Sequence, residues 1–238
     1  MKNVKELKVK IFADGADINE MKKAYKSGLI KGFTTNPTLM NKAGIADYTA
    51  FAKSVLKEIT DMPISFEVFS DDFKEMRREA KIIASWGKNV NVKIPITNTK
   101  GESSIPLIKE LSAEGVSLNI TAIMTLDQVK DVSGVLNPKV VNIISVFAGR
   151  IADTGRDPVP MMQKAKEILS NNENAKLLWA SPRELLNIFQ ADDIGCDIIT
   201  VVPDILKKLS LVGKDLTEFS LETVKMFYND AITSKFKI

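Results

Sequence analysis

The sequence predicts an α/β protein in which strands and helices alternate along the chain and close into a barrel. The first observation is that short apolar runs alternate with longer amphipathic segments, which is the pattern of parallel strands joined by helices. The second is that eight such runs fit into 238 residues, the usual length of a closed (β/α)8, or TIM, barrel. No glycine-rich dinucleotide fingerprint or phosphate-binding P-loop follows any of the runs.

The elements follow one another in a regular order. The expected strands span residues 9–14, 32–36, 64–68, 90–94, 117–122, 140–147, 176–181 and 197–202. The expected helices include residues 18–28, 48–59, 73–87, 105–115, 159–170 and 182–195, and several of these end at a glycine, as helices often do. No linker divides the chain, so we expect one domain over residues 1–238, with the barrel over about 8–212 and a helical tail over about 215–238.

The composition excludes several classes of site and partner. With no histidine, the chain can hold neither a Ser-His-Asp or Cys-His catalytic centre nor a histidine-ligated zinc site. The single cysteine, Cys196, excludes an internal disulfide and is typical of a reducing compartment. The net charge of +3 is not concentrated in a basic stripe, so no nucleic-acid partner is expected. No signal peptide or long apolar run is present, which predicts a cytoplasmic protein without a membrane partner.

The stretch NVNVKIPITN at 89–98 places Lys93 in the middle of an expected strand, where lysine is uncommon. Strand side chains alternate between the two faces, so Lys93 points into the barrel while its neighbours Val92 and Ile94 face the helices. The same alternation predicts polar groups inside the barrel at the carboxyl ends of most strands, where barrel enzymes hold their active sites. The residues expected to point inward are Phe12, Asp14, Thr34, Asn36, Ser65, Glu67, Asn91, Lys93, Asn119, Thr121, Ser145, Phe147, Trp179 and Ser181.

Each of these residues also has a purely structural interpretation. Asp14, Asn36 or Ser181 can cap the helix that follows it, and Glu67 and Lys93 can form a structural ion pair. The agreement of so many inward polar positions in face and depth is harder to explain in this way. The joint pattern therefore favours a catalytic site.

A lysine in a poorly hydrated lumen is a candidate nucleophile, because burial disfavours its charged form and the neutral amine attacks carbonyl groups. Schiff-base chemistry then needs a proton relay, for which Glu67, Asp14 and Thr121 are the candidates. Arg150 and Arg183 follow the sixth and seventh strands, and arginine suits the binding of a phosphate group. Ser181, before the next helix, adds a hydroxyl and backbone N–H groups.

At this point the chain resembles the transaldolase family, in its short single-barrel branch, which includes fructose-6-phosphate aldolase. The resemblance extends from about Ile11 to Pro203. The motifs that carry it are FADGAD at 12–17, GFTTNPTL at 32–39, FEV at 66–68, VKIP at 92–95, LNITA at 118–122, SVFAGR at 145–150 and ASPR at 180–183. The resemblance implies a (β/α)8 barrel with the Schiff-base lysine on the fourth strand, which is the position of Lys93.

The resemblance also implies a role for each residue. Lys93 would attack the ketose carbonyl, and Asp14 would exchange the proton of the C4 hydroxyl. Glu67 and Thr121 would hold the water that serves carbinolamine formation and breakdown. The residues implied in substrate binding are Asn36 and Asn119 for the dihydroxyacetone hydroxyls, Ser145 for the C1 end, Phe147 as a wall, Arg150, Ser181 and Arg183 for the terminal phosphate, and also Thr34. Neither a metal nor an organic cofactor is implied.

Several functions stay open at the level of the sequence. The first is a transaldolase of the pentose phosphate pathway, which transfers dihydroxyacetone between sugar phosphates. The second is an aldolase that releases free dihydroxyacetone, and the third is a barrel that binds without catalysis. The aldolase branch usually has glutamine at the position of Glu67, so Glu67 indicates a transaldolase.

Met124 is a departure from the resemblance. It stands where we expect the phenylalanine of transaldolases or the tyrosine of fructose-6-phosphate aldolases. A methionine there is expected to widen or reshape the pocket, which raises the alternative of a modified, for example sulfonated, ketose.

The tail raises the question of assembly. Short members of the family form large rings, often pentamers or decamers, with the C-terminal helix clasping a neighbour. The apolar residues of the tail, Phe219, Leu221, Val224, Phe227 and Tyr228, are suited to such a contact. The alternative is that the helix folds back on its own barrel.

Overall fold

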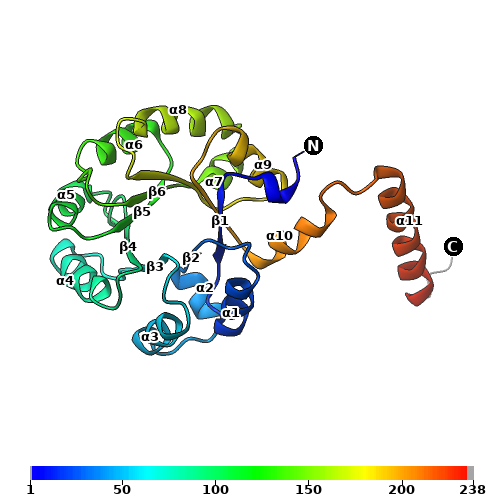
Figure 1. Ribbon diagram of the computed structural model, residues 1–238, viewed down its shortest axis with the longest axis horizontal. Helices are drawn as coiled ribbons and strands as arrows, with labels where there is room; N and C mark the ends of the chain where they lie inside the picture. Colours follow the sequence, from blue (N-terminus) through cyan, green and yellow to red (C-terminus); the bar gives the residue numbers. More distant parts are fainter. Residues whose placement is uncertain (1, 235–238) are drawn as a thin grey trace.

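The structure is a closed barrel of eight parallel strands, in the order β1 to β8, with β8 pairing to β1 (Figure 1). It is a computed structural model that describes residues 2–234. The strands are β1 Lys10–Asp14, β2 Phe33–Thr34, β3 Ile64–Glu67, β4 Val90–Pro95, β5 Leu118–Ile123, β6 Asn142–Val146, β7 Ala175–Trp179 and β8 Ile198–Val201. The predicted fold class, a (β/α)8 barrel with an extra C-terminal helix, is confirmed.

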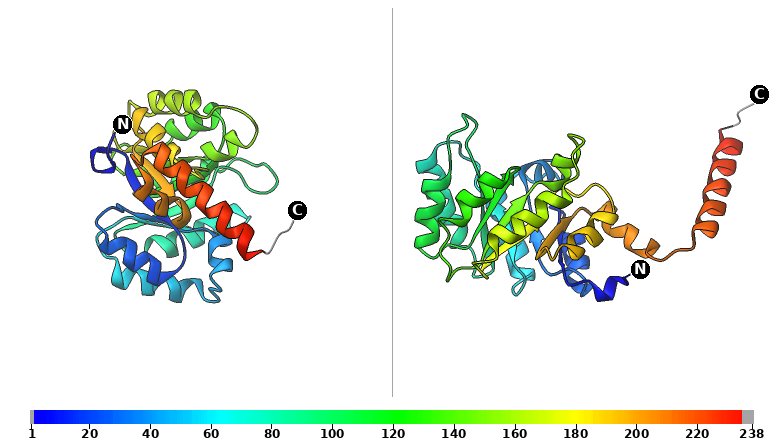
Figure 2. Two further views of the ribbon diagram at one scale, coloured as in Figure 1. Left: turned by 90° about the vertical axis from the view of Figure 1, so that its right-hand side faces the viewer. Right: turned by 90° about the horizontal axis from the view of Figure 1, so that it is seen from above.

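Helices follow the strands and surround the barrel (Figures 1 and 2). They are α1 Ile18–Lys26, α2 Pro37–Lys42, α3 Tyr48–Glu58, α4 Phe73–Ala84, α5 Ile105–Ala113, α6 Leu126–Ser133, α7 Ala148–Ala152, α8 Val159–Leu169, α9 Leu186–Asp193, α10 Pro203–Lys207 and α11 Leu216–Thr233. Two 3-10 helices, Val4–Glu6 and Lys208–Leu211, flank the barrel. None of the described helices is both long and apolar enough to cross a membrane.

Local sequence signals explain where several helices begin. Asp17, Asp47 and Asp72 each precede a helix and accept hydrogen bonds from backbone N–H groups of its first turn. A carboxylate at this position satisfies donors that the helix itself cannot pair, and it complements the helix dipole. Asn36 does the same for α2 with its side-chain oxygen, so the cap predicted for Asn36 is present.

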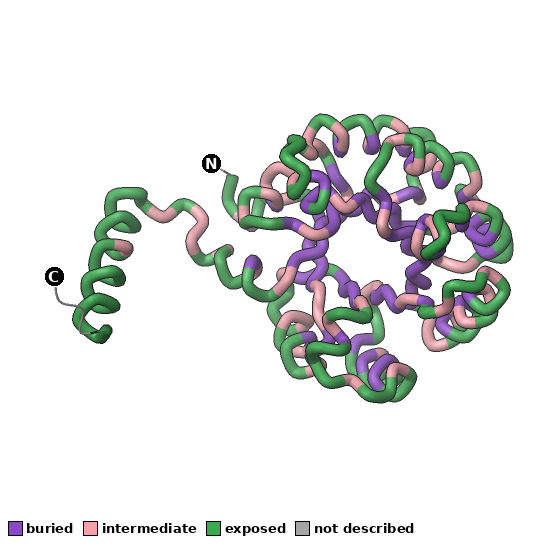
Figure 3. Tube along the Cα trace, turned by 180° about the vertical axis from the view of Figure 1, so that it is seen from behind, coloured by how far each residue is buried: buried purple, intermediate pink, exposed green. Residues whose placement is uncertain are grey.

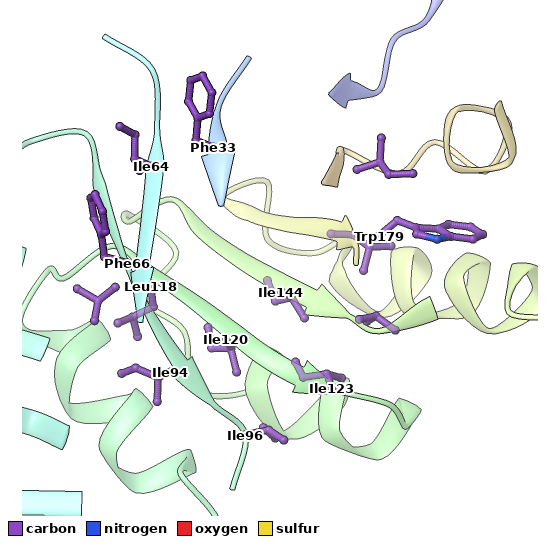
Figure 4. Packing of buried hydrophobic residues seen from close by; sticks show 14 of the residues in the cluster. Phe33, Ile64, Phe66, Ile94, Ile96, Leu118, Ile120, Ile123, Ile144 and Trp179 are labelled. Atoms are coloured by element: carbon purple, nitrogen blue, oxygen red, sulfur yellow. The ribbon is translucent and has the colours of Figure 1, made fainter. Parts of the chain in front are cut away.

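Two apolar clusters hold the barrel together. The larger lies between the strands and the helices, where residues such as Phe66, Ile94 and Ile120 are fully buried (Figure 4). The smaller fills the lumen. It consists of Phe12, Ile143, Leu178, Ala180 and Ile198, with Phe147 against it.

Trp179 was expected to fill the lumen, and this prediction is wrong. Its side chain is fully buried in the outer cluster, while Leu178 and Ala180 are the lumen residues of this segment. The prediction assumes that Trp179 and Ser181 share one face of a regular strand, but Ser181 lies outside the strand. Ser181 has φ 62° and lies beyond the end of β7.

The last helix, α11, lies apart from the rest of the molecule. None of its residues is buried, and the views agree that it stands away from the barrel (Figures 2 and 3). Leu216, Val224, Phe227 and Tyr228 are all at least 60 % exposed. The expected tail helix is present, but it does not fold back on its own barrel. The end of the expected tail, residues 235–238, lies outside the described residues.

Candidate active site

The carboxyl ends of the strands surround a cavity of about 550 Å³. All the predicted catalytic and substrate-binding residues lie in its lining. They are Asp14, Thr34, Asn36, Glu67, Lys93, Asn119, Thr121, Ser145, Phe147, Arg150, Ser181 and Arg183. The cavity sits at the end of the barrel at which strand alternation placed these side chains.

Lys93 lies at the centre of a charged group on β3 and β4. It is 8 % exposed, and its Nζ is 3.0 Å from Glu67 Oε2. Nζ also donates a hydrogen bond to the backbone oxygen of Thr35 at 3.1 Å. Glu67 and Lys93 are direct partners in the parallel ladder, so the strand register itself brings the amine and the carboxylate together.

Asp14 is held in place from β2. Thr34 Oγ1 donates to Asp14 Oδ1 at 2.8 Å, and Asn36 Nδ2 donates to Oδ2 at 3.4 Å. Burial raises the pKa of Asp14 above its ordinary value, while the positive charge of Lys93 and the Thr34 hydrogen bond oppose this rise. A carboxyl group whose pKa is raised is suited to take up and release a proton.

Glu67 is fixed through its backbone by Tyr48, a residue that the sequence analysis missed. Glu67 N donates to Tyr48 Oη at 2.7 Å, and the hydroxyl donates in turn to Glu67 O at 3.0 Å. Burial raises the pKa of Tyr48, so the phenol stays protonated and keeps both bonds. Its place in the first turn of a helix gave no sign of this contact.

Hydrogen bonds that span the lumen order its polar amides and hydroxyls. Asn119 Nδ2 donates to Ser65 Oγ at 2.9 Å, and Ser145 Oγ donates to Asn119 Oδ1 at 2.6 Å. Nearby, Thr121 Oγ1 is buried and has no hydrogen-bond partner within residues 2–234. A buried hydroxyl without a protein partner is available to a substrate in the cavity.

The rim of the cavity carries the two arginines. Arg183 Nε donates to Asp153 Oδ1 at 2.8 Å, Nη2 contacts Asp153 Oδ2, and Nη1 lies 3.3 Å from Ser181 Oγ. The hydrogen bond from Arg183, and then its charge, lower the pKa of Asp153, so the carboxylate stays ionised and holds the guanidinium. Arg150, in α7, lines the same rim.

The two segments that carry the arginines are packed tightly together. A Cβ added at Gly149 would lie 1.6 Å from the backbone oxygen of Ser181. Only glycine allows this approach, because real Cβ contacts are never so short. Gly149 was missed as a site residue, although its place in SVFAGR beside Arg150 gave a signal.

The structure adds Thr200 and Lys42 to the lining of the cavity. The hydroxyl oxygens of Thr200 and Thr34 are 2.5 Å apart, so Thr200 on β8 contacts the same hydroxyl that donates to Asp14. Strand alternation in DIITVV would have found Thr200. Lys42 ends α2, a short helix that was not among the expected ones, and no spacing in the sequence pointed to it.

Met124 does not belong to the cavity, so its expected effect on the pocket is wrong. Its side chain is 40 % exposed and is not among the lining residues, whereas Phe147 is. The backbone explains the difference: Ala122 has φ 63°, and the register between β5 and β6 shifts between Ile120 and Ile123. The aromatic side chain that lines the cavity is Phe147, which the resemblance implies as a wall.

No metal centre is found among residues 2–234, where no three His, Cys, Asp or Glu side chains are grouped as metal ligands. The chemistry that this arrangement offers is that of an amine beside a carboxylate, with a second, half-buried carboxyl group nearby and cations at the rim.

The chain is similar to known proteins over most of its length. Residues 11–238 match the sequence model of the family described as Transaldolase/Fructose-6-phosphate aldolase. A protein of Chelativorans sp. (strain BNC1) named "Probable transaldolase" is 36% identical over 218 residues, which is 90% of this chain and 94% of the relative. A protein of Nitrosopumilus maritimus (strain SCM1) with the same name is 34% identical, with 90% of this chain and 92% of the relative covered.

A solved structure shares the fold. It is that of a candidate lyase/mutase from Burkholderia cenocepacia J2315, with a TM-score of 0.61 and 10% sequence identity. The match covers 82% of this chain and 77% of that chain. The match of the family model over residues 11–238, together with relatives above 30% identity, shows that the chain belongs to the transaldolase/fructose-6-phosphate aldolase family.

Proposed function

We propose that the protein is a transaldolase that transfers a dihydroxyacetone unit between sugar phosphates through a Schiff base on Lys93. The observation that carries the proposal is the position of Lys93, buried at the centre of the cavity with its Nζ 3.0 Å from Glu67. An amine in contact with a carboxylate can lose its proton to that group and attack a ketose carbonyl.

Proton transfer is assigned to the two carboxyl groups and Thr121. Glu67, next to the amine, exchanges protons with the carbinolamine oxygen as water is lost or added, and the free hydroxyl of Thr121 holds that water. Asp14 takes the proton of the C4 hydroxyl when the carbon–carbon bond breaks, and returns it to the acceptor aldehyde. Its raised pKa supports this role, because the best acid–base groups titrate near the working pH.

Substrate binding is assigned to the remaining lining residues. Asn36 and Asn119 hold the dihydroxyacetone hydroxyls together with Thr34, and Ser145 contacts the C1 end. Arg150, Ser181 and Arg183 hold the terminal phosphate. The guanidinium of Arg183 is already oriented by Asp153, so little side-chain entropy is lost when phosphate binds.

One feature of the cavity favours a transaldolase over an aldolase that releases dihydroxyacetone. It is Glu67, which stands where the aldolase branch usually has glutamine. The case for a modified ketose rested on Met124, which lies outside the cavity lining.

The proposal includes a homo-oligomer that acts on small sugar phosphates in the cytoplasm, within the pentose phosphate pathway. The support for assembly is α11, whose exposed apolar residues contact nothing that buries them in their own chain. A surface of this kind is typical of a protein contact. Light scattering after size exclusion tests this part. A ring-sized mass supports it, and a monomer at micromolar concentration contradicts it.

The experiment that tests the catalytic proposal is borohydride trapping with fructose 6-phosphate, followed by peptide mass spectrometry. A dihydroxyacetone-sized adduct on Lys93 is expected, and it should be absent from Lys93→Met. An adduct on another residue, or none in folded protein, would contradict the assignment. Turnover with and without an acceptor aldehyde separates the two activities, because only an aldolase turns over without one.

A further inference from the structure

The opposite end of the barrel contains a second cavity, of about 540 Å³, that takes no part in the proposed reaction. Its lining comes from the amino ends of the strands. Lys10 is the first residue of β1, Ile198 is the first of β8, and Asn91 is the second of β4. The apolar lumen residues Phe12, Ile143 and Ile198 form its inner wall. The size matches that of the candidate active site, so a small phosphorylated molecule fits.

The charge of this second cavity is positive. Four lysines line it: Lys8, Lys10, Lys31 and Lys176. Lys8, Lys10 and Lys176 form no ion pair with any residue in the part of the chain that the structure describes. Within residues 2–234, Lys31 Nζ donates only to the backbone oxygen of Gly28, at 2.8 Å.

The two aspartates in the lining are each paired with a lysine outside it, and one of these lysines, Lys2, also pairs with Asp193. Asp192 Oδ2 is 2.8 Å from Lys2 Nζ, and its other oxygen accepts the backbone N–H groups of Lys8 and Val9. Asp197 Oδ2 is 2.6 Å from Lys166 Nζ. Neither Lys2 nor Lys166 lines the cavity, and four lysines against two aspartates leave the lining with an excess of positive charge.

Asn91 is the second observation that points to a ligand. Its residue is 6 % exposed and lines the cavity, and its side-chain amide makes no hydrogen bond with any described residue. The amide is not among the sealed, unpaired polar groups of residues 2–234, so it is open to the cavity. It can therefore exchange water for a polar group of a bound molecule.

We propose that this cavity, at the amino end of the barrel, binds a small phosphate-bearing molecule. The lysines hold the phosphate group as point charges, and Asn91 binds a hydroxyl or similar polar group of the same molecule. The apolar inner wall separates this molecule from Lys93, so the site is a binding site and not a second catalytic centre.

Isothermal titration calorimetry on the full chain tests the proposal without using activity. The background is Arg150→Ala/Arg183→Ala, which removes the phosphate-binding side chains at the carboxyl end. Two probes separate charge from shape: inorganic pyrophosphate, and glucitol 6-phosphate, which has hydroxyls but no carbonyl for Lys93 to attack. At least one probe is expected to bind at one site per chain in buffer with 150 mM salt.

Variants then locate the site. Lys10→Gln/Lys176→Gln should weaken binding about tenfold, since each lysine contributes a partly screened charge contact. Lys53→Gln/Lys57→Gln is the matched control, because it removes the same charge from the exposed face of α3 and should leave binding unchanged. Asn91→Ala should weaken glucitol 6-phosphate several-fold and leave pyrophosphate unaffected.

Three results would overturn the proposal. The first is that neither probe binds in the Arg150→Ala/Arg183→Ala background. The second is that the two double lysine variants lose affinity equally. The third is that Asn91→Ala leaves the affinity for glucitol 6-phosphate unchanged. If the arginine variant does not fold, the same titrations on the unmodified chain must show two sites, one of which is lost in Lys10→Gln/Lys176→Gln.

Discussion

The two ends of the barrel lumen differ in whether their central cations form ion pairs. At the carboxyl end the two cations nearest the proposed chemistry are paired, Lys93 with Glu67 and Arg183 with Asp153, whereas Arg150 and Lys42 form no ion pair among residues 2–234. At the amino end, Lys10 and Lys176 have none among residues 2–234. Paired charges hold each other in fixed positions, which a reaction requires. Unpaired charges attract an anion but leave its position loosely defined, which suffices for binding.

The largest test of this difference is Lys93→Met. If the carboxyl end is the catalytic one, transaldolase activity should fall at least about 10³-fold, because the nucleophile is lost. The free energy of unfolding of this variant should also fall by roughly 3 kcal/mol, since Glu67 is left as an unpaired and mostly buried charge. Kinetic assays and urea unfolding measure the two effects.

The control for Lys93→Met is the double variant Lys93→Met/Glu67→Gln. It should recover much of the stability and none of the activity. Pyrophosphate binding at the amino end should be unchanged in both variants. A loss of binding there would show that the two ends do not work independently.

The second test is Asp14→Asn, which should lower kcat by about 10²- to 10⁴-fold, the usual contribution of an acid–base group. The pKa of Asp14 is raised in the folded protein, so the acid limb of kcat/KM in the unmodified protein should lie above the usual aspartate range near 4. Below that limb the carboxyl group is protonated and cannot act as the base. A limb at or below pH 4 would contradict the assignment.

The same raised pKa predicts a pH dependence of stability. A carboxyl group with a raised folded pKa favours the folded state at low pH, and this contribution is lost as pH rises from the unfolded pKa to the folded one. Asp14→Asn removes this dependence. Its free energy of unfolding should therefore improve relative to the unmodified protein as pH rises from about 4, and then level off.

The third test is Gly149→Ala, which bears on the rigidity of the carboxyl end. The new Cβ would overlap the Ser181 backbone, so one of the two rim segments must move, at a cost of about 2–3 kcal/mol. Thermal unfolding and the KM for the sugar phosphate should both report the change. Gly134→Ala is the control, because its Cβ would meet only ordinary contacts, at 3.6 and 3.7 Å, and it should be nearly neutral.

The smallest expected effect is that of Asp153→Asn. The ion pair with Arg183 is about half exposed, so its loss should change stability very little. The KM for the phosphorylated substrate should rise roughly threefold to fivefold, because Arg183 is no longer oriented, while kcat stays similar. Asp131→Asn, on the exposed side of α6, should leave KM unchanged. A fall in kcat alone would contradict a positioning role.

The strands and most of the inward residues could be predicted because the two-residue period of a strand is a strong constraint. It brought Asp14, Glu67 and Lys93 to one cavity from three separate strands. The prediction failed where the backbone leaves the regular strand. Ser181, with a positive φ, lies in the cavity lining from beyond the end of β7, so its position does not fix the face of Trp179. Met124 follows Ala122, which also has a positive φ, and lies outside the cavity lining.

Contacts between distant segments could not be predicted from one sequence. Tyr48 bonds to the backbone of Glu67, and Gly149 packs on Ser181, but neither relation leaves a local pattern. The lysines of the amino end are a similar case. Each is an ordinary strand-end lysine in the sequence, and only barrel closure brings Lys10 and Lys176 to one cavity.

The hydrogen-bonded row Ser145–Asn119–Ser65 also has a consequence for how the chain folds. It joins β3 to β5, which are not neighbours in the sheet, across a sequence separation of 54 residues. A strand that slipped by one residue would turn Asn119 toward the helices and leave its amide unpaired among apolar side chains. The row therefore penalises misregistered barrels and makes the correct closure the one arrangement that satisfies all three polar groups.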